Sequence, residues 1–335
     1  MACTHIADVF LMAGPPIGNE QPHAHTRTAP NRASDTDLIM PKLLEDKVAI
    51  VTGAGRGLGR AHALELARHG ARMVLSDLGG APAAASIHAV AAEIERRGGA
   101  ALAVEADVTR PEEVESLVAI AEARWGRIDI LVNNAGILRD KSFAKMSLAD
   151  FRLVLDVHLM GAVHCTQAVW NGMRERGYGR IVFTTSSSGL YGNFGQANYS
   201  AAKMALVGLM QTLAIEGEKH DIRVNCLAPT ASTGLTEGVL PDMAMDALAP
   251  ERVSPGLVAL VSDSAPTRAI LLAGAGSYEC AHTTMTRGIH VDDAAQAADQ
   301  VRRRWDEVCS RSGEVVPAWG GEQYRLELAK AGVAA

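Results

Sequence analysis

The chain has 335 residues, of which 48% are hydrophobic and 21% charged, so it can bury a sizeable core, and its composition excludes a mainly disordered protein. Its 32 basic and 38 acidic residues give a net charge of −6, which provides no general attraction for nucleic acid or for an anionic membrane. The five cysteines are scattered without a C-x-x-C pair, and no uncharged apolar run has the length of a membrane helix. We therefore expect no metal site, no membrane or nucleic-acid partner, and a location in the reducing cytoplasm.

Three parts are expected along the chain. Residues 1–40 have no periodic apolar pattern, which predicts a disordered leader. Residues 41–276 carry a regular alternation of strand-like and helix-like runs, which predicts one domain. Residues 277–335 turn polar and are expected to form a C-terminal extension with a helix near 291–309 and a frayed end.

Within the expected domain, short β-rich runs alternate with helical stretches, as a parallel sheet with crossover helices requires. Several runs are apolar throughout, which is typical of strands covered by helices on both faces. The prediction is an α/β fold of the Rossmann type, a doubly wound seven-stranded parallel sheet with helices on both faces. The expected strands are 48–52, 73–77, 101–104, 128–133, 181–185, 222–226 and 270–273, and two of the expected helices are 59–70 and 111–125.

A glycine-rich turn follows the first expected strand, with Gly53, Gly57 and Gly59 placed just before a long helix. Glycine permits a tight turn and lets backbone N–H groups approach a phosphate, while the helix N-terminus adds partial positive charge. We therefore expect the pyrophosphate of a dinucleotide at this turn, which also contains Arg56 and Leu58.

Asp77 stands at the end of the second expected strand, beyond the glycines. Its carboxylate can accept hydrogen bonds from both ribose hydroxyls of NAD, and it would repel the 2′-phosphate of NADP. The predicted cofactor is therefore NAD. Arg56 leaves an alternative open, because a guanidinium in the same loop can bind a phosphate.

Tyr199 and Lys203 are spaced at i and i+4 on an expected helix, so they lie on one helical face. A neighbouring cation favours the phenolate form of tyrosine, which can then take a proton from a carbinol oxygen. Ser186, near the end of the fifth expected strand, can hydrogen-bond the same oxygen.

Taken together, these residues resemble the short-chain dehydrogenase/reductase family over most of the expected domain. The motifs that carry the resemblance are Gly53-x3-Gly57-x-Gly59, Asn133-Asn134-Ala135-Gly136, Ser186 and Tyr199-x3-Lys203. The stretch from Ser188 to Lys203 is similar, more narrowly, to the (3R)-hydroxyacyl-CoA dehydrogenase unit of the peroxisomal multifunctional enzymes of type 2.

The resemblance implies catalytic roles for Ser186, Tyr199 and Lys203, and it places Asp107 and Asn133 beside the adenine and ribose of the cofactor. The full set of cofactor contacts that it implies, besides Tyr199 and Lys203, is Gly53, Arg56, Gly57, Leu58, Gly59, Asp77, Asp107, Val108, Asn133, Ala135, Gly136 and Pro229.

Two positions depart from the family pattern. His158 stands where the wider family often has a fourth catalytic residue, Asn, so it is either a structural histidine or a relay of protons through water to Lys203. Thr230 follows Pro229 where many relatives have Gly, which alters the turn near the nicotinamide.

Two segments are candidates for substrate contacts. In this family, residues 233–249 would be the substrate lid, and their apolar side chains would line an acyl or sterol pocket or else pack in the core. Arg139, Lys141 and Lys145 are candidates for binding a CoA phosphate, with simple surface solvation as the alternative.

The expected function is an NAD-dependent oxidoreductase that interconverts a 3-hydroxyacyl-CoA and a 3-oxoacyl-CoA by hydride transfer. The alternatives are a hydroxysteroid dehydrogenase, acting on a 17β-hydroxysteroid or a sterol side-chain CoA ester, a 3-oxoacyl-ACP reductase, and a non-catalytic NAD-binding subunit. The expected partner is thus a small-molecule acyl-CoA or sterol-like substrate. The family's long helices, here near residues 150–173 and 199–218, imply a homodimer or homotetramer.

Overall fold

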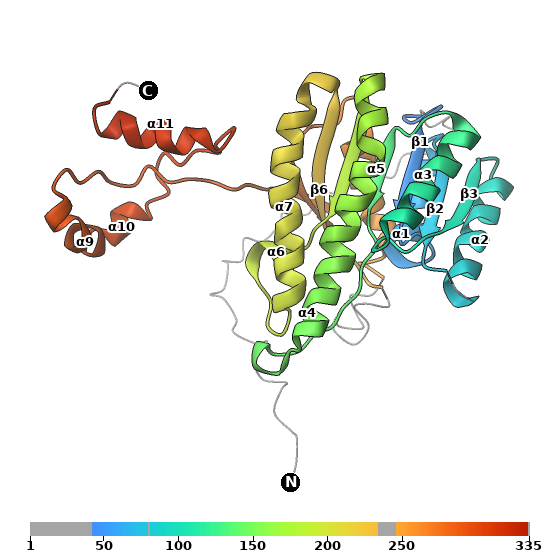
Figure 1. The fold of residues 1–335 in the computed structure, drawn as a ribbon, viewed down its shortest axis with the longest axis horizontal. Helices are drawn as coiled ribbons and strands as arrows, with labels where there is room; N and C mark the ends of the chain where they lie inside the picture. The colour runs from blue at the N-terminus through green and yellow to red at the C-terminus, as the bar shows by residue number, and fades with distance from the viewer. Residues whose placement is uncertain (1–41, 80, 234–245, 334–335) are drawn as a thin grey trace, which may run out of the picture. The chain divides into compact units, whose positions relative to one another are not determined.

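A computed structural model of the chain describes residues 42–79, 81–233 and 246–333 (Figure 1). The predicted leader, residues 1–40, lies outside the described residues.

The described strands form one eight-stranded sheet in the order β3-β2-β1-β4-β5-β6-β7-β8. Each neighbouring pair from β3 to β7 is parallel, whereas β8 pairs antiparallel with β7. All seven predicted strands are present, and the expected doubly wound fold is confirmed. The strands are β1 Val48–Thr52, β2 Arg72–Asp77, β3 Ala101–Glu105, β4 Ile130–Asn133, β5 Gly179–Thr184, β6 Ile222–Thr230, β7 Ile270–Gly274 and β8 Ser277–Ala281.

The predicted number of strands was wrong by one, because β8 lies in the segment that was expected to form only an extension. A two-residue turn, Ala275–Gly276, joins β7 to β8, and both of its residues have positive φ, 52° and 80°. Positive φ at both central positions is the geometry of a tight hairpin turn. The four residues Ser277 to Cys280 are all exposed, so β8 shows none of the apolar pattern by which a strand is found from sequence.

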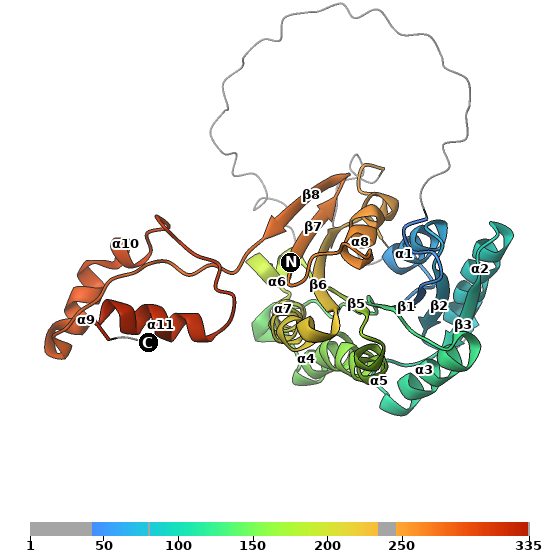
Figure 2. The ribbon, with the colours of Figure 1, turned by 90° about the horizontal axis from the view of Figure 1, so that it is seen from above.

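Helices cover both faces of the sheet (Figure 2). One buried apolar cluster joins the sheet to α1, α2 and α8, and a second joins it to α3, α5 and α7. The helices of this region are α1 Gly57–Arg68, α2 Ala81–Arg96, α3 Pro111–Trp125, α4 Leu148–Leu155, α5 Gly161–Arg176, α6 Ser187–Tyr191, α7 Ala197–Gly217 and α8 Ser254–Val261.

The strand β1 shows why the strand sequences are apolar throughout. Val48 and Ile50 belong to the cluster under α3, α5 and α7, whereas Ala49 and Val51 belong to the cluster under α1, α2 and α8. Successive side chains of a strand point to opposite faces, so a strand covered on both faces buries every residue. The burial of all five residues of β1 fits this geometry.

The C-terminal segment contains three helices where the sequence predicted one. The predicted helix at 291–309 is divided into α9 Ala294–Arg303 and α10 Trp305–Val308. A third helix, α11 Gly321–Lys330, was not predicted, and it ends before the final residues. Its sequence is rich in Glu, Gln, Leu, Ala and Lys, which have high helix propensity and could have signalled it.

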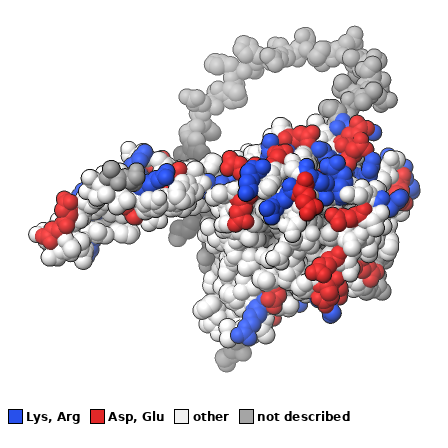
Figure 3. All heavy atoms as spheres, turned by 45° about the horizontal axis from the view of Figure 1, so that its top comes forward, with Lys and Arg blue, Asp and Glu red and all other residues white. Residues whose placement is uncertain are grey.

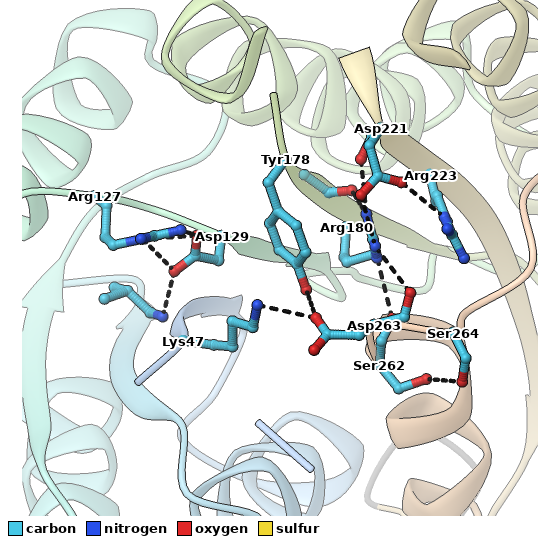
Figure 4. Close-up of polar contacts among 12 residues, drawn as sticks. Lys47, Arg127, Asp129, Tyr178, Arg180, Asp221, Arg223, Ser262, Asp263 and Ser264 are labelled. Atoms are coloured by element: carbon cyan, nitrogen blue, oxygen red, sulfur yellow. Dashed lines mark hydrogen bonds and ion pairs between the residues drawn. The ribbon is translucent and has the colours of Figure 1, made fainter. Parts of the chain in front are cut away.

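Charged residues gather where the parallel strands begin, and Figure 3 shows basic and acidic side chains interspersed over this part of the surface. Arg180, at the start of β5, is 1% exposed, and its guanidinium donates to the carbonyl oxygens of Asp221, Ser262 and Asp263. Tyr178 donates from its hydroxyl to Asp263 Oδ1 over 2.8 Å (Figure 4). We call these bonded polar residues at the amino ends of the strands the amino-edge network. Its members are Lys47, Arg127, Asp129, Tyr178, Arg180, Asp221, Arg223 and Asp263.

Candidate active site

The glycine turn lies between the carboxyl end of β1 and the start of α1. Gly53 and Gly57 have φ of +65° and +52°, which other residues rarely adopt. A Cβ atom on Gly59 would lie 2.0 Å from the carbonyl oxygen of Gly53, so only glycine fits there. Arg56 is exposed at the N-terminal boundary of α1, and Leu58 packs partly against the core. The turn and the helix N-terminus therefore form the expected phosphate-binding arrangement.

A hydrogen-bonded bridge fixes this turn to the end of β4. Asn134 Nδ2 donates to the carbonyl oxygens of Thr52 and Gly53, at 2.9 and 3.2 Å. In return, Thr52 Oγ1 accepts from the backbone N–H groups of Asn134 and Ala135, at 3.0 and 3.1 Å. Thr52 and Asn134 were not among the predicted site residues, although the second follows directly from its place in the Asn133–Gly136 motif.

Asp77 lies at the carboxyl end of β2, beside the same turn. Its Oδ2 accepts from the N–H of Gly55 at 3.0 Å, and its Oδ1 accepts from the N–H of Leu78 at 2.9 Å. These bonds hold the carboxylate in one orientation next to the glycine turn, where the sequence placed a ribose-binding group.

Asp107 and Val108 follow β3, and both contribute to the local packing. Asp107 Oδ1 accepts from the backbone N–H and from the hydroxyl of Thr109, each at 2.8 Å. Val108 packs against Gly161, where an added Cβ would lie 2.6 Å from its Cγ2. One carboxylate oxygen of Asp107 is thus used to shape the turn before α3.

Ser186, Tyr199 and Lys203 come together where β5 ends and α7 begins. Ser186 Oγ accepts from the N–H of Ser188 at 3.2 Å, and the Ser186 side chain acts to lower the pKa of Tyr199. Lys203 is buried, its Nζ donates to the carbonyl oxygen of Thr184 at 2.5 Å, and this nitrogen lies 5.5 Å from the centre of the Tyr199 ring. The three side chains that were expected to act together therefore share one site.

Burial dominates the ionisation of this site. It lowers the pKa of Lys203 to about 7 and raises the pKa of Tyr199. The Ser186 side chain acts in the opposite direction on Tyr199, whereas the charge of Asp140 raises the tyrosine pKa further. Among the groups that act on the pKa of Tyr199, burial has the largest effect and outweighs the contribution of Ser186.

His158 lies in a π-helical turn, Asp156–Met160, between α4 and α5. Its Nε2 is 2.8 Å from the carbonyl oxygen of Ile137, and its ring meets the Tyr199 ring edge to face with centroids 5.2 Å apart. A Cβ on Gly136 would lie 2.3 Å from the histidine Cε1, so this glycine makes room for the ring. Burial lowers the pKa of His158 to about 3, which keeps the imidazole neutral, and its Nδ1 has no hydrogen-bond partner.

A cavity of about 10 Å³, the space of one water molecule, lies beside Lys203 and His158. Among its lining residues are Asn133, His158 and Lys203. Asn133 Nδ2 donates to Thr166 Oγ1 at 3.2 Å, but Asn133 Oδ1 is buried without a partner, as His158 Nδ1 is.

Other predicted site residues lie along the same edge of the sheet. Pro229 is half-buried near the carboxyl end of β6, followed by the exposed Thr230. Of the predicted lid, residues 234–245 lie outside the described residues. In the described parts of the chain, no group of His, Cys, Asp and Glu side chains is arranged to hold a metal ion. No helix of those parts has the length and apolar character needed to cross a membrane.

The carboxyl edge of the sheet fits a nicotinamide dinucleotide. The glycine turn leaves no room for side chains where a phosphate would approach, and Asp77 presents an anchored carboxylate beside it. The unpartnered Asn133 Oδ1 adds a buried acceptor at the end of β4. This is the edge at which ligands of open α/β sheets bind, outside the carboxyl ends of the strands.

Comparisons with known proteins agree with this geometry. A family model described as short chain dehydrogenase matches residues 47–243. The peroxisomal multifunctional enzyme type 2 of Mus musculus is 43% identical over 288 residues, which cover 84% of this chain and 39% of the mouse protein. The chain therefore spans about two fifths of the length of that relative.

Two solved structures are similar in fold. The full-length peroxisomal multifunctional enzyme type 2 from Drosophila melanogaster has a TM-score of 0.73 and 35% identity, over 87% of this chain and 50% of that chain. A short chain dehydrogenase from Mycobacterium avium has a TM-score of 0.70 and 35% identity, over 83% of this chain and 99% of that chain. Together with the glycine turn and the Tyr199–Lys203 pair on α7, these matches show that the chain belongs to the short-chain dehydrogenase/reductase family, whose members are NAD(P)-dependent oxidoreductases acting on a CH–OH group.

Proposed function

We propose that this protein is an NAD-dependent dehydrogenase that interconverts a 3-hydroxyacyl-CoA and a 3-oxoacyl-CoA. The observation that carries the proposal is the grouping of Ser186, Tyr199 and Lys203 at the same sheet edge as the glycine turn. The thioester substrate is supported by the similarity of residues 188–203 to (3R)-hydroxyacyl-CoA dehydrogenase units and by the likeness to peroxisomal multifunctional enzymes.

In the oxidative direction, Tyr199 takes the hydroxyl proton of the substrate and Ser186 holds the substrate oxygen by a hydrogen bond. Lys203 lies 5.5 Å from the Tyr199 ring and, when protonated, favours the phenolate. A bound nicotinamide would accept the hydride, and the protein positions the reacting groups and provides their electrostatic surroundings. Tyr199 is half-buried, and its partial removal from water strengthens these electrostatic contacts.

His158 completes the site as a positioning and relay group. Its Nε2 lies 2.8 Å from the carbonyl oxygen of Ile137 and 3.1 Å from the Ile137 N–H, so either tautomer finds a backbone partner there, and Nδ1 is left for a further hydrogen bond. A water molecule in the adjoining cavity would have both His158 Nδ1 and Lys203 within its lining. Once the proton of the substrate has reached Tyr199, such a water can accept a proton from Lys203 and pass it on toward solvent, so that a proton leaves the site in each oxidation.

The choice of NAD is assigned to Asp77. Its carboxylate is fixed by the N–H groups of Gly55 and Leu78, so it cannot move aside easily for a 2′-phosphate. Replacing Asp77 by Ser should lower kcat/KM with NAD and raise it with NADP, and this change in preference tests the assignment. An unchanged ratio of the two kcat/KM values would contradict it.

The substrate class is tested by kinetics with NAD and a panel of alcohols. We expect the highest kcat/KM for a straight-chain 3-hydroxyacyl-CoA, assayed as each enantiomer. A higher value for a 17β-hydroxysteroid or a sterol side-chain CoA ester would favour a hydroxysteroid dehydrogenase, and a preference for NADPH with an ACP thioester would favour a reductase. Absence of turnover across the panel would favour a non-catalytic NAD-binding subunit.

A homodimer or homotetramer in the cytoplasm is proposed as the working form. Several large apolar side chains are exposed on α7 and in the C-terminal segment, among them Ile215 at 47% and Trp305 at 58%. The four described cysteines are all unpaired, as is usual in a reducing compartment. Light scattering tests the subunit number, and cell fractionation tests the location.

A further inference from the structure

A short loop after β4 is bonded to the residues that lead into α7. Gln196 Nε2 donates to Asp140 Oδ2 at 2.6 Å, and the N–H of Lys141 donates to the carbonyl oxygen of Gly195 at 2.9 Å. Asn198 Nδ2 donates to the carbonyl oxygen of Arg139 at 3.1 Å. Segments that are more than fifty residues apart in sequence are therefore joined by three hydrogen bonds immediately before Tyr199.

The orientation of Gln196 within this contact is determined by a further bond. Asn193 Nδ2 donates to Gln196 Oε1 at 3.0 Å, which leaves the Gln196 NH₂ group to face Asp140. Next to the contact, Asn198 is fully buried, and its Oδ1 accepts from the N–H of Tyr199 at 2.8 Å. The contacts that reach the backbone of Tyr199 thus start at the carbonyl of Arg139, the residue before Asp140.

The charges that surround Tyr199 come from several elements. Lys203 lies one turn further along α7, and His158 packs edge to face from the π-helical turn and is neutral. Cys226 of β6 is buried near Lys203, and burial raises the pKa of its thiol, which therefore carries no charge at neutral pH. Asp140 is the carboxylate whose charge acts on the tyrosine.

The two cationic neighbours of Asp140 in the loop are directed elsewhere. Lys141 Nζ lies 3.6 Å from Asp150 of α4, and the Arg139 guanidinium donates to the carbonyl oxygen of Leu138. The carboxylate of Asp140 is therefore bonded to an uncharged amide and its charge is paired with neither of these two cations.

We propose that Asp140 is a positioning residue for Tyr199, which holds the start of α7 through its hydrogen bond with Gln196 and adds a negative charge to the loop that meets this end of the helix. This inference rests on the proposed role of Tyr199 as the base. It assigns two separable contributions to one side chain, a hydrogen bond that orders the loop and a charge that opposes phenolate formation.

The charge is tested with Asp140→Asn, which removes it while leaving an oxygen that can accept from Gln196. In the pH profile of kcat/KM for alcohol oxidation, the rise assigned to Tyr199 should move to lower pH by roughly 0.3 to 1 unit, the size expected for one charge at medium range. The shift should shrink at high ionic strength, because Asp140 is exposed. An unmoved profile, or a move to higher pH, would overturn the role of the charge.

The hydrogen bond is tested with Gln196→Leu, which retains the charge of Asp140. We expect kcat to fall about tenfold at every pH, since misplacement of a catalytic group slows the reaction, with the midpoint of the profile unchanged. A wild-type kcat in this variant would overturn the positioning role. Glu216→Gln is the matched control, because Glu216 is exposed at the far end of α7, and it should change neither quantity.

Failure of this inference can be told apart from failure of the proposed function. If Tyr199→Phe retains ordinary turnover, the base itself is wrongly assigned. If Tyr199→Phe is inactive and Asp140→Asn keeps the wild-type profile, only the inference on Asp140 is wrong.

Discussion

At the two ends of the parallel strands, the network around Arg180 and the site around Lys203 differ in how their buried polar atoms are bonded. At the amino ends, the buried guanidinium of Arg180 is bonded to surrounding carbonyl oxygens and to Asp221, and Asp129 accepts from Arg127 and from the N–H of Val48. At the carboxyl ends, buried polar atoms of Asn133 and His158 have no partner.

This difference suggests that the network at the amino ends serves stability and that the site at the carboxyl ends serves catalysis. A buried polar group that is fully bonded contributes to a unique fold, whereas one without a partner reduces stability and is available to a ligand. Lys203 shows the second case, because its burial lowers the pKa of the ammonium to about 7. We therefore expect substitutions in the amino-edge network to alter stability alone, and substitutions at the carboxyl edge to alter catalysis.

The largest effect is expected from Tyr199→Phe, which removes the proposed base and little else. Turnover should fall about a thousandfold or more, which corresponds to about 4 kcal/mol in the barrier, because no other group of the site is placed to take the proton. Binding of NADH, followed by fluorescence, should stay close to that of the wild type. Turnover within tenfold of the wild type would contradict the assignment of Tyr199 as the base at the carboxyl edge.

Arg180→Met tests the amino-edge network. The substitution leaves carbonyl oxygens of Asp221, Ser262 and Asp263 without their donor, so we expect a loss of about 3 kcal/mol in the free energy of unfolding and a lower Tm. Well below the Tm, kcat should be unchanged. The control is Arg174→Met, an exposed arginine, which should change Tm little. A large fall in kcat for Arg180→Met would contradict the separation of the two ends.

Lys203→Met sharpens the comparison, because it should stabilise the protein while removing turnover. The folded-state pKa of Lys203, about 7, lies below its ordinary value of 10.5, so the folded chain resists protonation of this group. The resulting loss in the free energy of unfolding is largest below pH 7 and decreases as the pH rises toward 10.5. Thermal unfolding should therefore show a gain of roughly 1 to 3 kcal/mol near pH 6 and a smaller gain near pH 9. A lower Tm at both pH values would contradict this.

The sequence predicted what depends on local patterns. Strand β1 and helix α3 lie where their apolar runs and the proline at position 111 indicated. The hairpin strand β8 was missed because its side chains are exposed, so it lacks the apolar pattern of the other strands.

Contacts between segments that are far apart in the sequence could not be predicted from the spacing of residues. The bridge from Asn134 to Thr52 and the bond from Gln196 to Asp140 join loops that only the finished sheet brings together. For the same reason, the sequence suggested that Lys203 acidifies Tyr199, whereas the depth of burial of both groups is a property of the packed fold.

One measurement tests the central claim most directly, namely that the carboxyl edge of this sheet oxidises a hydroxyacyl thioester. The wild-type protein is incubated with NAD and a 3-hydroxyacyl-CoA that carries deuterium at C3, and the reduced cofactor is analysed by mass spectrometry. We predict that the deuterium is found in NADH and that oxidation is slower than with the unlabelled substrate. Formation of no NADH, or loss of the label to water, would contradict the proposed reaction.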